Sequence, residues 1–97
     1  MTIEQRLHEG SRAREVLENE AYMAAFSAIK EELTDKWMNS PLRDAEGREK
    51  LFQMLTMLRK VQMCLENTMA TGKLATEDLK YKRSLAQQAK DFLGMPS

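Results

Sequence analysis

The sequence predicts an all-α fold: an antiparallel helical hairpin with a short additional helix at each end. Apolar residues recur at spacings of three and four in two long segments, the pattern of one helical face. Both prolines, Pro41 and Pro96, lie outside these segments, and a short polar stretch around Pro41 separates them. We therefore expect one domain over residues 1–97, with a hairpin core at about 20–71.

The first expected helix covers about residues 3–18. Thr2 and Gln5 have the spacing of a capping box, in which each side chain satisfies a backbone N–H of the first turn. The apolar face is narrow and is formed by Ile3, Leu7, Ala13 and Leu17. Gly10 costs about 1 kcal/mol relative to alanine inside a helix. We therefore expect this helix to be weakly held or to depend on a partner.

The second expected helix covers about residues 20–38, after an Asn19 cap. Its apolar face is formed by Tyr22, Phe26, Ile29, Leu33 and Trp37. Pro41 ends the segment because a proline excludes the residue before it from the helical region. Trp37 is expected to close the open end of the hairpin, and the alternative is an interface contact.

The third expected helix runs from about 45 to 71. Asp44 is its cap, and Gly72 is its expected end because glycine adopts the left-handed cap conformation without strain. Its main apolar face is formed by Leu51, Met54, Leu55, Leu58, Val61, Leu65 and Met69. This face is expected to pack against the aromatic face of 20–38.

A fourth helix is expected at about 77–93, capped by Thr76 and ended by Gly94 and Pro96. Its apolar residues are Leu79, Leu85, Ala86, Ala89, Phe92 and Leu93.

The long helix carries more apolar side chains than one neighbouring helix can cover. The additional ones are Phe52, Met57, Met63 and Cys64, which we take as candidate self-association residues. For the Cys64 thiol, the favoured interpretation is a small buried side chain beside Val61 and Leu65. The surplus favours a homo-oligomer.

Formal net charge is zero, which argues against nucleic-acid binding through bulk positive charge. Residues 1–50 hold eleven acidic and eight basic residues, and residues 51–97 hold seven basic and four acidic ones, so the halves differ in sign. Lys80, Lys82 and Arg83 lie in the most basic part and are the candidate nucleic-acid contacts, although a solvated helix face is the favoured interpretation.

No constellation for catalysis, cofactor binding or metal binding is found in the sequence. His8 is the sole histidine, and Arg12 stands where a zincin helix would need a second one. The four glycines are isolated, so no phosphate-binding loop is predicted. One cysteine, no run of eighteen apolar residues and no apolar leader segment favour a reduced, intracellular setting without membrane insertion. The expected function is non-enzymatic.

The run from VLENEAY through KWMNSPLRDAEGREKLF to LENTMATGKLA resembles a group of small proteins encoded by tailed bacteriophages, many of unassigned function. The resemblance covers about residues 15–75 and carries no catalytic motif. The positions that carry it are Asn19, Trp37, Ser40, Pro41, Arg48, Glu49, Gly72 and Lys73. It implies a phage-encoded helical accessory protein linked to virion assembly, located in the host cytoplasm or in the virion.

The favoured hypothesis is therefore a structural or assembly protein that self-associates through apolar faces of its long helix. Two alternatives remain at this point. One is a DNA-associated packaging or regulatory accessory that uses the basic C-terminal helix, and the other is an inhibitor of a host protein.

Overall fold

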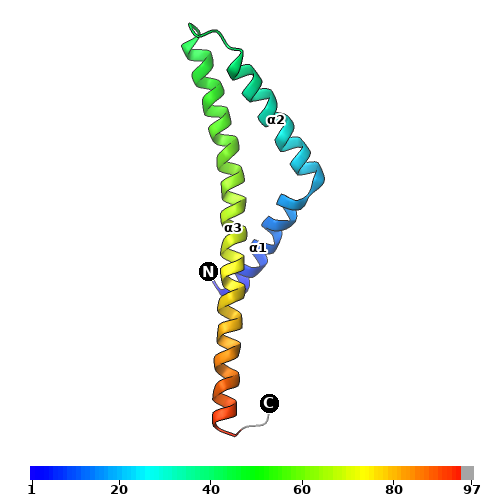
Figure 1. Cartoon of the computed structure of the whole chain (residues 1–97), viewed down its shortest axis with the longest axis vertical. Coiled ribbons are helices and arrows are strands. Elements are labelled where there is room, and N and C mark those ends of the chain that lie inside the picture. Colours follow the sequence, from blue (N-terminus) through cyan, green and yellow to red (C-terminus); the bar gives the residue numbers. More distant parts are fainter. Residues whose placement is uncertain (95–97) are drawn as a thin grey trace.

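The computed structural model describes residues 1–94, and within them the chain forms three helices and no strand: α1 (Ile3–Glu18), α2 (Glu20–Met38) and α3 (Ala45–Phe92). The prediction of an all-α fold is confirmed. α3 has 48 residues, which at a rise of about 1.5 Å per residue gives a rod of about 72 Å. It accounts for almost the whole 77 Å length of the molecule (Figure 1).

The three helix starts form as the sequence predicts. The Thr2 hydroxyl accepts from the Gln5 backbone N–H at 3.1 Å, while the Gln5 side chain accepts from the Thr2 N–H at 2.9 Å. The Asn19 side chain accepts from the Tyr22 N–H at 2.9 Å, and Asp44 accepts from the Gly47 N–H at 3.0 Å. Each cap is local, because its side chain reaches a backbone group only three residues away.

The predicted end of the long helix at Gly72 is wrong. Gly72 lies inside α3, which continues without a break to Phe92, so the separate C-terminal helix expected at 77–93 and the hairpin boundary at 71 are wrong as well. Thr76 does not act as a cap; its hydroxyl donates to the Gly72 carbonyl at 3.1 Å within the same helix. Gly94 is the one glycine with positive φ, +71°, and it follows the last turn as predicted. Pro96 lies outside the described residues.

The helices form an open triangle rather than a closed hairpin. In Figure 1, α2 leaves the end of α3 and diverges from it, the chain bends at Asn19, and α1 returns to cross α3 near the middle of that helix. The predicted packing of the α2 aromatic face along α3 is therefore incomplete: Tyr22 and Phe26 are half-buried, whereas Ile29 is 47% exposed.

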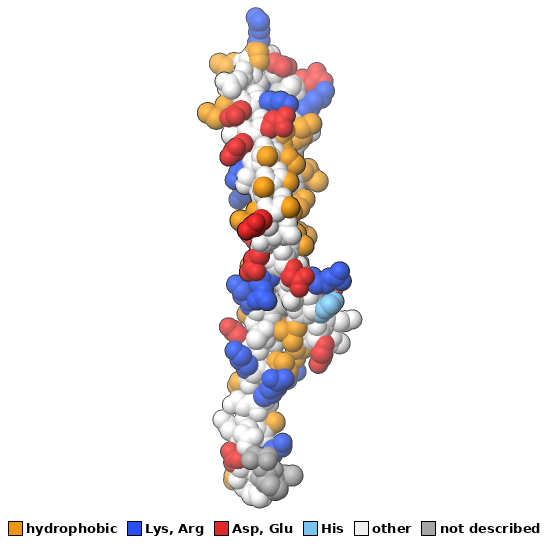
Figure 2. Space-filling model, turned by 90° about the vertical axis from the view of Figure 1, so that its right-hand side faces the viewer, with side chains coloured by type: hydrophobic (Ala, Val, Ile, Leu, Met, Phe, Trp, Pro, Cys, Tyr) orange, Lys and Arg blue, Asp and Glu red, His pale blue; other side chains and the backbone are white. Residues whose placement is uncertain are grey.

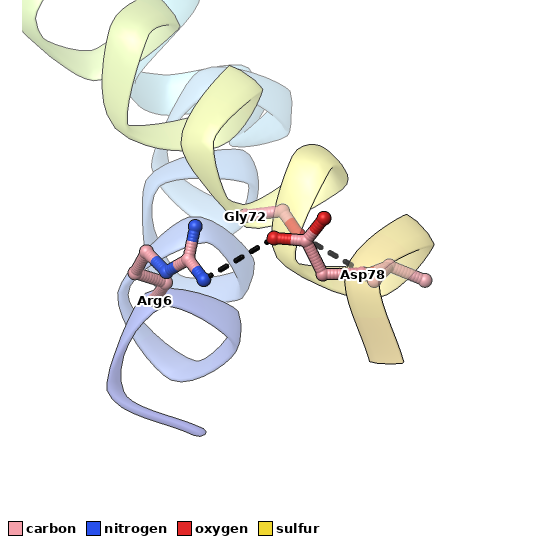
Figure 3. Close-up of polar contacts among 4 residues, drawn as sticks. Arg6, Gly72 and Asp78 are labelled. Atoms are coloured by element: carbon pink, nitrogen blue, oxygen red, sulfur yellow. Dashed lines mark hydrogen bonds and ion pairs between the residues drawn. The ribbon is translucent and has the colours of Figure 1, made fainter. Parts of the chain in front are cut away.

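The tightest packing is the crossing of α1 over α3, formed by Gly10, Ala13, Gly72 and Ala75. These four are the buried residues of the two helices. A Cβ placed on Gly10 would lie 2.6 Å from the Gly72 Cα, and one placed on Gly72 would lie 2.8 Å from the Gly10 Cα. The glycine expected to weaken the first helix thus permits its backbone to touch that of α3. A single ion pair, Arg6 to Asp78 at 3.4 Å, flanks the crossing (Figure 3).

The chain is extended and buries little of its surface. Its radius of gyration is 22.0 Å, against about 12.5 Å for a compact domain of this length. Its accessible surface is 7917 Å², which is about half of the roughly 16,000 Å² that the unfolded chain exposes. A compact domain of this length would bury about two-thirds of its unfolded surface, so the chain buries less than its length predicts. Ala13 and Ala75 are the buried hydrophobic residues among those described.

The turn between α2 and α3 is held by Arg48. Its guanidinium donates to the Ser40 hydroxyl at 2.9 Å and to the Ser40 carbonyl at 3.3 Å, and it lies 4.8 Å from the centre of the Trp37 ring. Trp37 is half-buried at this end of the molecule. A cation over an indole face adds about 0.5–1 kcal/mol at a partly exposed site.

We expect Gly72→Ala to lower the melting temperature although alanine is the better helix former. The new methyl group would meet the Gly10 backbone, and such overpacking costs about 1–3 kcal/mol. The exposed variant Ala86→Gly, elsewhere on α3, calibrates the propensity effect alone, about 1 kcal/mol. Thermal unfolding followed by circular dichroism measures both, and a higher melting temperature for Gly72→Ala would refute the crossing.

We expect Arg48→Ala to loosen the turn, because it removes the Ser40 hydrogen bonds and the cation over Trp37. The loss should be about 1–2 kcal/mol in the free energy of unfolding. Trp37 is the sole tryptophan, so its fluorescence emission should shift to the red. Lys50→Ala, which removes only an exposed pair with Glu46, is the matched control and should leave the emission unchanged.

Candidate functional site

The candidate self-association residues all lie on α3 and are exposed. Phe52 is 56% exposed, Met57 is 59% and Met63 is 46%, and the Cys64 side chain is exposed as well. The interpretation of Cys64 as a buried thiol is wrong, because no neighbouring helix covers its face of α3. The sequence indicates more apolar side chains on the long helix than one neighbouring helix can cover, and these exposed side chains belong to that surplus.

These four residues occupy two different faces of α3. At about 100° per residue, Met57 and Cys64 lie within about 20° of each other, as do Phe52 and Met63, while the centres of the two pairs are about 120° apart. A single flat contact cannot cover all four. The structure therefore divides the predicted site into two surfaces.

The first surface is a flank stripe formed by Met54, Met57, Val61 and Cys64. Sequence analysis assigned Met54 and Val61 to the face that packs against α2, yet they are 53% and 50% exposed. Their spacing with Met57 and Cys64 is that of alternating a and d positions of a heptad, the signal that identifies a helix-packing seam. Figure 2 shows hydrophobic side chains gathered along one side of the upper half of the molecule, the part that α2 and the first half of α3 form.

The half-buried residues of α3 mark the side that α2 approaches. Leu55 and Leu58 form, with Phe26 of α2, the floor of a hollow between the two helices. Its rim consists of Lys30, Arg59 and Gln62. The Tyr22 hydroxyl, near the bend between α1 and α2, is buried without a hydrogen-bond partner within residues 1–94.

The candidate nucleic-acid contacts do not form one surface. Lys80, Lys82 and Arg83 are all exposed on the part of α3 that extends past α1. Lys80 and Arg83 lie about 60° apart around the helix, but Lys82 points about 160° away from Lys80. A duplex lying on one side of α3 would meet only two of the three.

Within residues 1–94, no group of three or more histidine, cysteine or carboxylate side chains is placed to hold a metal ion. Over the same residues, none of the helices combines the length and the apolar character needed to cross a membrane.

Comparisons with protein-family models, with curated proteins and with solved structures returned no match.

Proposed function

We propose that the chain is a non-enzymatic assembly protein that self-associates through the apolar faces of α3. One observation carries the proposal: the single chain fully buries no large side chain among the described residues, yet leaves Phe52, Met57 and Met63 about half exposed. A monomer in this form would hold a large apolar surface in water, whereas contiguous apolar patches on monomers are normally small.

Association would supply what the chain lacks. Burial of apolar area contributes about 25 cal/mol per Å², less the cost of lost translational and side-chain freedom. The long straight α3 presents its exposed apolar side chains along an extended line, which favours contact with another elongated helix over contact with a compact ligand. Support for a phage setting and a role in virion assembly comes from the sequence resemblance alone.

A DNA-associated accessory is the second candidate. It is favoured by the exposed C-terminal end of α3, where residues 80–92 contain four basic residues, Lys80, Lys82, Arg83 and Lys90, and one acidic residue, Asp91. Neutralising Lys80, Lys82 and Arg83 together should then abolish salt-sensitive binding to duplex DNA. Binding is measured by the fluorescence anisotropy of labelled duplex DNA at low salt. If the anisotropy does not rise when the unmodified protein is added, this candidate is ruled out.

The assembly proposal is tested by solution mass. Size-exclusion chromatography with light scattering should report an oligomer over a concentration series, and Met63→Glu should shift it toward monomer while circular dichroism stays helical, because Met63 is exposed on a formed helix. Ser27→Glu adds the same charge to an exposed position of α2 and should leave the mass unchanged. A well-folded monomer at high concentration would contradict self-association.

Leu58→Asp should lose both fold and assembly. Leu58 is half-buried against the Phe26 side of α2. A carboxylate at this position lowers the free energy of unfolding by about 2–4 kcal/mol, because packing is lost and a charge is desolvated. Chemical denaturation and solution mass measured on the same sample distinguish this effect from that of Met63→Glu.

A further inference from the structure

The far side of α3 from the crossing carries a line of apolar side chains from Phe52 to Phe92, with Thr56, Asn67 and Gln88 on the same side. Its members recur at intervals of eleven residues in two series, Phe52, Met63, Leu74 and Leu85 in one and Ala70, Tyr81 and Phe92 in the other. Eleven residues advance an α-helix by three turns and only about 20°, so both series stay on one side of a straight helix. We call these seven residues the back stripe.

The back stripe is free of α1. Gly72, the contact point of the crossing, follows Met63 by nine residues, which places it about 180° around α3 from the stripe. Leu74 is 60% exposed, Tyr81 66% and Phe92 88%. These side chains are covered by nothing in the described chain.

Charged residues straddle the back stripe at two places and with opposite signs. Arg59 and Lys60 lie on its two edges in the upper half of α3, and Glu77 and Asp78 lie on its two edges in the lower half. Arg59, Lys60 and Glu77 make no ion pair within residues 1–94, whereas Asp78 pairs with Arg6 at the crossing. The edges of the back stripe are therefore positively charged near residues 59–60 and negatively charged near residues 77–78.

From this arrangement we infer that the back stripe binds the back stripe of a second copy, antiparallel, about a two-fold axis between Thr68 and Met69. The inference rests on the proposed self-association and specifies its surface, direction and register. A parallel pair would bring opposite edges together and place Arg59 beside Lys60 of the second copy and Glu77 beside Asp78, which costs free energy because the charges are alike.

In this register the four members of the first series face one another in pairs, while Ala70, Tyr81 and Phe92 face Asn67, Thr56 and Ala45. Phe52 and Leu85 are equidistant from the axis and face each other across it, as do Met63 and Leu74. A two-fold axis brings the same edge of both helices together, because each copy is the other reversed. Arg59 and Glu77 are five helical turns apart, at about 3.6 residues per turn, and so lie on one edge.

Lys60 and Asp78 have the same separation and lie on the other edge. Arg59 therefore meets Glu77 of the second copy, and Lys60 meets Asp78. The two-fold repeats both contacts, so two Arg59–Glu77 ion pairs form on one edge, and on the other edge each Lys60 lies beside an Asp78 that also pairs with Arg6 of its own chain.

The size of this surface fits a stable dimer. From Phe52 to Phe92 the stripe is about 60 Å long, and a helix is about 10 Å wide. Two such strips bury about 1,200 Å² in total, at the lower end of stable interfaces. Because α1 contacts the opposite side of α3, the second copy can approach without displacing the crossing.

Charge reversal and its rescue test the register. Arg59→Glu and Glu77→Arg should each raise the dimer dissociation constant at least about tenfold, because like charges then face each other twice. The double variant, and an equimolar mixture of the two single variants, should return to within about threefold of the unmodified protein. Positions 59 and 77 of one chain are about 27 Å apart, so rescue cannot arise within a chain.

Sedimentation equilibrium over a dilution series measures these constants, and Lys82→Glu, which reverses a charge outside the stripe, is the matched control. An unmodified protein that associates, with no effect of single reversal or no rescue, overturns the register and leaves the proposed function standing. An unmodified protein that stays monomeric throughout overturns both.

Disulfide trapping tests the direction separately and does not depend on the charge variants. In a Cys64→Ala background, Met63→Cys combined with Leu74→Cys should oxidise to a dimer in which position 63 of one copy is joined to position 74 of the other. Peptide mapping by mass spectrometry identifies the link. Links of 63 to 63 and 74 to 74 would indicate a parallel pair, and they or the absence of any link in an associated protein would overturn the inference.

Discussion

The architecture depends on the contact between the Gly10 and Gly72 backbones. Without Cβ atoms at these two positions, α1 and α3 approach until a methyl group on either would lie under 3 Å from the other's Cα. Ala13 and Ala75 extend the close contact by one turn on each helix. The crossing fixes one end of the open triangle, and the Arg48 turn fixes the other, so α2 is held between two anchored ends although it packs loosely along its length.

Close packing of small residues has a consequence for the rest of the surface. Because the crossing is made of glycine and alanine, it consumes almost none of the large apolar side chains in the chain. Leucine, methionine and phenylalanine side chains remain distributed along α3, half-buried on the α2 side and exposed elsewhere. Such a chain has no interior of large apolar side chains, and its exposed apolar surfaces are suited to packing against other helices. Its extended shape follows because the crossing of small residues does not gather the large side chains into one core.

The candidate site was only partly accessible to sequence reasoning. The surplus of apolar residues on the long helix was visible, and Phe52, Met57, Met63 and Cys64 are exposed as that surplus implies. Met54 and Val61 were assigned to the α2-facing side, since a helical wheel cannot tell where a neighbour diverges. Leu74 and Tyr81 were missed because a helix assumed to end at Gly72 interrupts the eleven-residue spacing that connects Leu74 to Met63 and Tyr81 to Ala70.

The sequence by itself determined the helical class and every helix start, since the caps at Thr2, Asn19 and Asp44 need only groups within three residues. It also determined the end at Gly94, where positive φ favours glycine over any residue with a side chain. Only the tertiary structure decided the role of Gly72. A glycine that ends a helix and a glycine that admits a second helix are identical in local sequence, and what distinguishes them is a backbone sixty-two positions earlier in the chain, at Gly10.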